Sequence, residues 1–421
     1  FMQGGVCYNK AVPIAMAALT NKEIIVPPEP GLMGAFGVAL EVKKRIEKNL
    51  LEKKLFSLSE LIEREINFDK SFVCIGGKDN CDRKCQISVF NINGKLFPFG
   101  GACNLCNTIK TKDKPNITTD YVKIRQDLVF NKYINSKKFD TSKKTIGILK
   151  SFLTNTYYPL FYNYFSELGF NVILESVPNP AGVEKVSSSF CYPVELSHAF
   201  MENLISKKPN YIFIPHIKEL AKKDDNKINQ KTCVLVQSES YYLTSAFKDE
   251  LNGINILSPV INFNNIFDDK LGLIKTAIDL GINKEEAHKT LSAALKKQNE
   301  MFSEFKEHGK HFIDDLKADP EEIGIVLIGR SYNAFAEQAH LGIPRKFTSR
   351  NISIVPMDFL DFDMYESINH MYWGTGTQIV KTAKLIVNNP QLFGVYITNF
   401  SCGPDSFLLG YFRDIMGSKP S

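Results

Sequence analysis

Long apolar runs are absent from this sequence of 421 residues, and so are blocks of charge of one sign. No stretch reaches the roughly 20 apolar residues that a membrane-spanning helix needs, and none has the pattern of a secretory signal peptide. We therefore expect a cytoplasmic protein without a membrane partner. The formal net charge is only +5, with Lys and Arg spread along the chain, so we expect no nucleic-acid partner.

Cysteine is also sparse, since nine cysteines in a chain of this length are too few for a disulfide scaffold. Five of them lie between Cys74 and Cys106, and such clustering in a cytosolic chain indicates metal or redox use. The composition, 44% hydrophobic and 23% charged, is that of an ordinary globular protein. Because the chain begins at Phe1 without an initiator Met and ends without a tail, we expect an internal piece of a longer protein.

Periodicity and composition predict an α/β protein with five segments. These are an α/β remnant (1–65), a small Cys-rich β module (66–125), a first α/β unit (140–283), a helical arm (284–318) and a second α/β unit (319–421). Strands are expected at 1–3, 23–26, 145–149, 170–174, 211–215, 323–328, 352–356 and 392–398. Helices are expected at 10–19, 32–48, 158–168, 193–205, 284–312 and 378–387, and after Pro404. Each of the two large units is predicted to be a Rossmann-like parallel sheet flanked by helices.

The Cys-rich module contains a hairpin signal, Asn93-Gly94, whose two turn positions both require a positive φ. Close pairs of cysteines on either side of a hairpin are the usual arrangement of a zinc ribbon, and a 4Fe–4S cluster takes the same soft ligands. We expect four of five thiolates to bind. Cys81, Cys85 and Cys103 are the safer three, and Cys74 and Cys106 compete for the fourth place. Spacing alone does not separate zinc from iron.

Three further cysteines are dispersed along the chain, and they form a second candidate site. Cys191 and Cys402 each lie in a loop that opens a predicted helix, and a helix N-terminus lowers the pKa of a thiol. Cys402 follows a core strand, where open α/β sheets bind their ligands. Cys233 fits less well, because it could begin a strand as a small buried residue. A single cysteine is more often a core hydrophobe than a ligand.

Weaker candidates complete the set. Gly4 and Gly5 lie between a predicted strand and a helix, where backbone can approach a nucleotide. His216 ends a predicted strand and could carry a proton or support a ligand, although a solvated loop histidine is as plausible. Arg330 could hold a CoA phosphate or carboxylate, with a surface ion pair as the alternative.

Longer strings in the sequence are more specific than these single residues. The segments QGGVCYNK (3–10), VPP (26–28) and LMGAFG (32–37) resemble the final part of the actin-like ATPase domain of 2-hydroxyacyl-CoA dehydratase activators. The segment from CDRKC (81–85) to FGGACN (99–104) looks like the start of the large domain that follows it. The segments FCYPVELSH (190–198), FIPH (213–216), GRSYNAF (329–335) and YITNFSCGPDS (396–406) resemble the dehydratase-subunit-type domain of fused activators.

The resemblance implies an ATP-dependent, low-potential electron-transfer activator of anaerobic metabolism, with a DUF2229-type domain and a dehydratase D-component-like domain. It implies that Gly4 and Gly5 would touch ATP, with its Mg, in the intact protein, and that Cys191, Cys233 and Cys402 hold a 4Fe–4S cluster with one open iron. Implied partners are upstream ATPase domains of the same polypeptide, a donor such as ferredoxin or flavodoxin, and an acceptor iron–sulfur enzyme. One residue departs from the family string, because Ser331 stands where proline is expected, and we expect this to alter a turn.

Two alternatives remain open at this point. The chain could be an iron–sulfur reductase or dehydratase in its own right, whose open cluster iron binds a small substrate. It could also be a non-catalytic docking module whose Cys-rich hairpin is stabilised by zinc. The sequence names no acyl-CoA and no oligomeric state.

Overall fold

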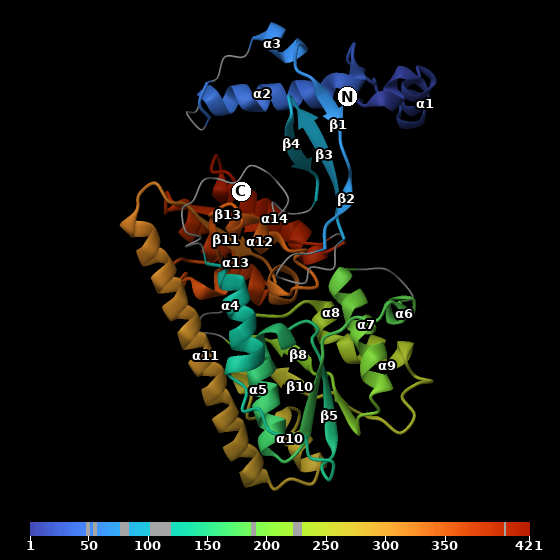
Figure 1. Ribbon diagram of the computed structural model, residues 1–421. Helices are drawn as coiled ribbons and strands as arrows, with labels where there is room; N and C mark the ends of the chain where they lie inside the picture. Colours follow the sequence, from blue (N-terminus) through green and yellow to red (C-terminus); the bar gives the residue numbers. More distant parts are fainter. Residues whose placement is uncertain are drawn as a thin grey trace. The chain divides into compact units, whose positions relative to one another are not determined.

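The computed structural model describes residues 1–47, 51–53, 57–75, 84–101, 119–186, 191–221, 230–399 and 401–421. The chain forms two compact units. The first contains residues 1–74 and 86–100, and the second contains residues 75–85 and 101–421. Figure 1 labels their helices and strands.

The first unit contains short helices followed by an antiparallel sheet in which β1, β2 and β4 all pair with β3. The β3–β4 hairpin turns at Asn93 and Gly94, whose φ values of 51° and 80° confirm the predicted turn. The helices are α1 Ala11–Thr20, α2 Met33–Glu47 and α3 Leu58–Ile62, with 3-10 turns Gly5–Tyr8 and Pro30–Leu32; the strands are β1 Ile66–Phe68, β2 Phe72–Val73, β3 Gln86–Ile92 and β4 Lys95–Phe99.

Two predicted strands of the first unit are wrong. Residues 1–3 and 23–26 contain no strand, and the backbone bond from Met2 N to Ile25 O (2.9 Å) is what joins them. Apolar composition alone predicted these strands, but a strand forms only where a partner supplies a ladder of hydrogen bonds. The predicted helices at 10–19 and 32–48 are confirmed as α1 and α2.

In the second unit, a four-stranded parallel sheet has the order β6-β5-β7-β9. Alternate residues of its strands enter different buried clusters, since Ile148 packs in the cluster that includes α5 and Leu149 in the cluster that includes α7. A parallel pair, β8 and β10, accompanies it. The elements are β5 Thr145–Leu149, β6 Asn171–Glu175, β7 Tyr211–Phe213, β8 His216–Glu219, β9 Asn255–Leu257, β10 Val260–Asn262, α5 Thr154–Glu167, α6 Pro180–Val183, α7 Tyr192–Ser206, α8 Val234–Gln237, α9 Glu239–Ala246 and α10 Leu273–Asp279, with a 3-10 turn Phe263–Asn265.

A three-stranded parallel sheet, in the order β12-β11-β13, follows in the chain. Its strands were all predicted, because apolar runs such as that of β11, whose five residues are all buried, are typical of central parallel strands. The elements are β11 Gly324–Ile328, β12 Ser353–Pro356, β13 Leu392–Tyr396, α12 Ile343–Thr348, α13 Gly374–Val387 and α14 Gly403–Met416, with a π-helical turn Ser331–Phe335 and a 3-10 turn Met357–Phe359.

Two helices connect the two parallel sheets. Helix α4, Tyr121–Asp127, precedes the first sheet in the chain and continues as a π-helical turn, Leu128–Lys132, yet it packs against β12 of the second sheet. Helix α11, Lys284–Ala318, contacts α5 as well as the turn Met357–Phe359, and Figure 1 shows it passing beside both regions. The parallel sheets of the predicted α/β fold are therefore confirmed, and their close connection was not predicted.

Helix α11 is long but carries charged residues along its length. Its buried positions recur every three or four residues, as expected for one apolar face of a helix. Within the ranges described above, no helix has the combination of length and apolar character that a membrane crossing requires.

Candidate functional site

Each of the three dispersed cysteines is the residue that precedes a helix. Cys191 precedes α7, Cys233 precedes α8 and Cys402 precedes α14. The predicted positions of Cys191 and Cys402 are thus confirmed, whereas Cys233 opens a short helix and does not begin a strand. Helix N-termini carry partial positive charge and favour anions, so these positions suit thiolates. The effect is weakest for α8, which has four residues.

Arg330 forms a buried ion pair beside Cys402. Its Nε donates to Asp405 Oδ1 (3.0 Å), and Nη2 lies 2.9 Å from the same oxygen. Asp405 belongs to the first turn of α14, three residues after Cys402, and it also accepts hydrogen bonds from the Tyr396 and Thr398 hydroxyl groups at 3.1 and 2.9 Å. The alternative of a surface ion pair for Arg330 is wrong, because the side chains of Arg330 and Asp405 are 4% and 0% exposed.

Glycine is required immediately before this arginine. Gly329 has φ 145°, and a Cβ atom there would lie 2.6 Å from Ile397 O. The backbone after β11 therefore passes very close to the backbone after β13. This close approach brings Arg330 within reach of α14.

The cysteines share electrostatic neighbours, which places them in one region of the second unit. Arg330 interacts with both Cys402 and Cys233, and Tyr332 interacts with the same two thiols. Cys191 interacts with Cys233 and Arg330. The structure thus brings together three cysteines that are 42 and 169 positions apart in the chain (191 to 233, and 233 to 402).

Burial, not the helix N-terminus, dominates the pKa of these thiols. It raises the pKa of Cys191 to about 11 and that of Cys402 to about 12. Arg330 acts in the opposite direction on both, as do the backbone N–H groups of Val194 and Asp405. The expectation of lowered thiol pKa values is therefore wrong for the metal-free chain. Burial destabilises the thiolate by more than the helix N–H groups and Arg330 stabilise it.

The three cysteines are thiol donors, the ligand type that iron–sulfur clusters use. In the described part of the chain, no group of three or more Cys, His, Asp or Glu side chains is arranged to hold one ion. Arg330 Nη2 also retains an N–H group without a hydrogen-bond acceptor among the described residues, since its contact with Asp405 lacks hydrogen-bond geometry. Such a buried donor suits an anionic sulfur-containing group.

Two polar residues of this region, the half-buried Tyr242 and the buried Glu239, were not predicted from the sequence. Tyr242 interacts electrostatically with Glu239, Cys191 and Cys233. Glu239 is 5% exposed, its Oε1 has no partner among the described residues, and burial raises its pKa to about 8. No local pattern identifies either residue, because both lie on the short helix α9, where a polar sequence is typical of the surface.

His216 does not end a strand, as predicted, but begins β8. It is 8% exposed, so the alternative of a solvated loop histidine is wrong. Its Nδ1 lies 2.7 Å from Gln237 O, at the end of α8, the helix that Cys233 opens. The geometry suits a residue that supports this helix, and its predicted proton-carrying role stays a prediction.

The other candidate sites stay predictions as well. Of the Cys-rich set, Cys74 follows β2 and Cys85 precedes β3, and the predicted ligands Cys81, Cys103 and Cys106 lie outside the described residues. Gly4 has φ 101° and Gly5 starts a 3-10 turn. A Cβ atom at either glycine would meet no atom within 4 Å among the described residues, so this part of the chain does not reveal the predicted ATP contact.

One family model matches the sequence. It is described as the CoA enzyme activase uncharacterised domain (DUF2229) and covers residues 145–360. That range runs from β5 to the turn after β12 and includes Cys191, Cys233 and Arg330, while Cys402 and Asp405 lie beyond it. The curated proteins contain no match.

Proposed function

The chain belongs to the CoA enzyme activase family that this domain defines, and from this premise we propose that it carries an iron–sulfur cluster for electron transfer. Cys191, Cys233 and Cys402 are the proposed ligands of a 4Fe–4S cluster. The observation that carries the proposal is the convergence of these three thiols around Arg330, although two of them lie in the matched domain and one lies beyond it.

The residues of this chain would hold and tune that group. Such a cluster accepts and releases single electrons at low potential. The helices that begin after the cysteines direct backbone N–H groups toward the thiolates, and Arg330 supplies a buried positive charge. Asp405 fixes Arg330 and is itself held by Tyr396 and Thr398. Because hydrogen bonds and nearby charge set the potential of a cluster, these residues would tune it.

The remaining roles are proposed on the same premise. The chain would receive an electron from ferredoxin or flavodoxin, driven by ATP hydrolysis in upstream ATPase domains of the same polypeptide. It would pass that electron to an iron–sulfur enzyme that acts on a CoA ester. Cys74, Cys81, Cys85, Cys103 and Cys106 are proposed to supply four ligands to zinc or to a further cluster.

The test is an analysis of iron, acid-labile sulfide and zinc on protein purified without oxygen, comparing the unaltered chain with Cys402→Ala. Cys7→Ala provides the matched control, because Cys7 is a buried thiol of the first unit. We expect Cys402→Ala to lose about four irons and four sulfides per chain, and Cys7→Ala to lose none. Zinc that survives Cys402→Ala would belong to the Cys-rich segment. Absence of iron from the unaltered chain, even after reconstitution, would refute the proposal.

A further inference from the structure

Helix α5 contains a proline that leaves one of its carbonyl groups free. Pro159 has no N–H group, so Asn155 O lacks its usual donor four residues later. Arg125 of α4 fills this place, because its Nη1 donates to Asn155 O at 2.9 Å. The start of α5 is therefore tied to a side chain from another helix.

Gln298 of α11 inserts into the same turn. Its Nε2 donates to Thr156 O (3.0 Å), and its Oε1 accepts from Leu160 N (3.2 Å). These two backbone groups would pair with each other in a regular α-helix. The buried side-chain amide of Gln298 therefore fixes the position of Thr156 from the opposite side.

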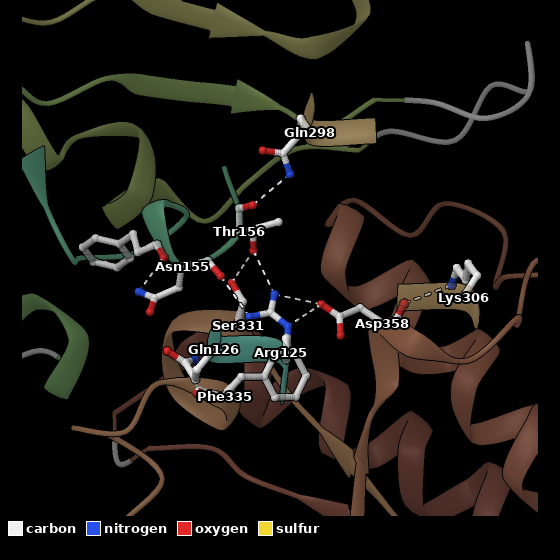
Figure 2. A network of polar contacts seen from close by, with 10 residues as sticks. Arg125, Gln126, Asn155, Thr156, Gln298, Lys306, Ser331, Phe335 and Asp358 are labelled. Carbon is white, nitrogen blue, oxygen red and sulfur yellow. Dashed lines mark hydrogen bonds and ion pairs between the residues drawn. The ribbon is translucent and has the colours of Figure 1, made fainter. Parts of the chain in front are cut away.

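Arg125 is the centre of the network drawn in Figure 2. It is completely buried, it pairs with Asp358 Oδ2 through Nε and Nη2 (both 2.8 Å), and its Nη2 donates to Thr156 Oγ1 at 3.4 Å. Its guanidinium also lies over the Phe335 ring, 4.7 Å from the centroid. Both sheets contribute to this contact, since Thr156 follows β5 and Asp358 follows β12.

The network ends on the residue after Arg330. Thr156 Oγ1 donates to Ser331 Oγ at 2.8 Å (Figure 2). Since Thr156 Oγ1 also accepts from Arg125 Nη2, a chain of two hydrogen bonds joins the Arg125 guanidinium to Ser331, and the positive charge polarises both bonds. Arg330 and Ser331 thus anchor one short segment in two directions, the first to Asp405 of α14 and the second to Thr156 of α5.

We infer that the Thr156–Ser331 hydroxyl pair is a positioning device that sets the Arg330 guanidinium against the three-cysteine site. Arg330 and Ser331 are consecutive, so a shift of Ser331 moves the backbone from which Arg330 extends. Arg125 and Gln298 fix the position of Thr156 at the start of α5. Thr156 in turn fixes Ser331, and through it the position of the Arg330 charge. Thr156 and Ser331 are positioning residues, and they act through Arg330.

The backbone at Ser331 allows its hydroxyl group to be removed by substitution without a change of backbone conformation. Ser331 occupies the first position of the π-helical turn, and Arg330 before it is extended, with φ −72° and ψ 141°. Proline is tolerated at a first helical position and after an extended residue. This backbone is compatible with either residue, so what serine adds is the hydroxyl group, and the expectation that Ser331 alters a turn relative to the family string stays a prediction.

The first experiment uses the metal-free chain and does not depend on the proposed cluster. The exchange of the Arg330 Nε–H with solvent is measured by NMR in the unaltered chain and in Thr156→Val, Ser331→Ala and Ser331→Pro. We expect all three variants to exchange at least about fivefold faster, the factor that corresponds to the loss of one hydrogen bond. Thr156→Ser retains the hydroxyl group and should exchange at the original rate.

The matched control is Thr276→Val, which removes a buried threonine hydroxyl of α10 that donates to the O atom of Gly272, the residue before this helix. It should leave the Arg330 exchange rate unchanged. Unchanged exchange in Thr156→Val and Ser331→Ala would overturn the inference, and so would an equal acceleration in Thr276→Val or in Thr156→Ser.

The second experiment rests on the proposed function and uses the iron-loaded chain. Withdrawal of a positive charge makes the gain of an electron less favourable, so the midpoint potential should become more negative in Ser331→Ala and stay unchanged in Thr276→Val. Faster Arg330 exchange without a change in potential would contradict the assignment of the pair to the cysteine site. If the unaltered chain binds no iron, the proposed function fails, and the exchange experiment still decides the placement of Arg330.

Discussion

At the residue scale, the most demanding feature is the ion pair between Arg330 and Asp405, because both side chains are removed from water. A buried pair contributes little net stability, but removal of one partner leaves an uncompensated charge. The other side-chain contacts of Asp405 are the hydroxyl groups of Tyr396 and Thr398 and the Cys402 thiol, and none of them replaces its negative charge. The stability of this region therefore depends on the carboxylate of Asp405.

This dependence is tested by Asp405→Asn, with Asp414→Asn as the control because Asp414 is exposed on the same helix, α14. We expect Asp405→Asn to lower the free energy of unfolding in urea by about 3–5 kcal/mol. The control should change it by less than about 0.5 kcal/mol. Equal effects of the two substitutions would show that the buried charge of Arg330 does not need Asp405.

Glu239 makes stability depend on pH. Its folded-state pKa of about 8 lies above the unfolded value, so the folded chain keeps a proton that the unfolded chain loses. The stabilisation is complete below about pH 4.5 and is lost as pH rises toward 8. We expect Glu239→Gln to become more stable relative to the unaltered chain by up to about 1.4 kcal/mol for each pH unit in this window.

The measurement is urea unfolding of both proteins at pH 5.5 and pH 7.5, read by circular dichroism. Glu322→Gln, at an exposed position, is the control and should follow the unaltered chain at both pH values. A constant difference between Glu239→Gln and the unaltered chain would contradict the assignment of a protonated buried carboxyl group.

At the element scale, the close contact between α11 and the turn Met357–Phe359 positions the end of the second sheet. Gly309 of α11 makes this contact possible, since a Cβ atom there would lie 2.1 Å from Phe359 O. Lys306, one turn earlier, donates to Asp358 O and Leu360 O at 3.0 and 2.7 Å. Helix α11 is thus fixed against the segment that contains Asp358, the partner of Arg125.

Gly309→Ala should therefore destabilise the protein, although alanine is the better helix former by about 1 kcal/mol. The Phe359 backbone cannot move away freely, and overpacking of this kind costs about 1–3 kcal/mol. Gly410→Ala in α14 is the control, because a Cβ atom there meets nothing within 4 Å and should add up to about 1 kcal/mol of stability. Thermal unfolding of both variants separates the two effects. Stabilisation by Gly309→Ala would contradict the close packing.

Sequence patterns predicted the apolar strands of the parallel sheets and missed the short strands β8, β9 and β10. Strands β5, β11 and β13 are apolar runs, and their pattern is local. Helix α8 has four residues, too few for a helical repeat of apolar residues to be recognised. The sequence therefore did not identify Cys233 as the residue before a helix, as it did for Cys191 and Cys402. The split of residues 211–219 into β7 and β8 depends on pairing with distant β9 and β10, and no local pattern contains that information.

At the scale of the whole molecule, the two parallel sheets of the second unit are joined by contacts between residues far apart in the chain. Arg125 pairs with Asp358, and Gln298 completes a turn of α5. Neither contact is predictable from sequence spacing. The charge partner of Arg125 lies 233 positions away in the chain, and Gln298 takes the place of a hydrogen bond between two backbone groups of another helix. The grouping of Cys191, Cys233 and Cys402 was predicted from the family resemblance, whereas the buried position of Arg330 beside these cysteines was not.

The central claim is that three cysteines from distant parts of the chain form one site. It is tested most directly by the iron and sulfide content of Cys191→Ala, Cys233→Ala, Cys402→Ala and the triple variant, each reconstituted without oxygen beside Cys7→Ala. Because a cluster binds as a unit, each single substitution should remove about the same iron as the triple variant, about four per chain. Losses that add up from one substitution to the next, or full iron content in Cys233→Ala, would contradict the claim.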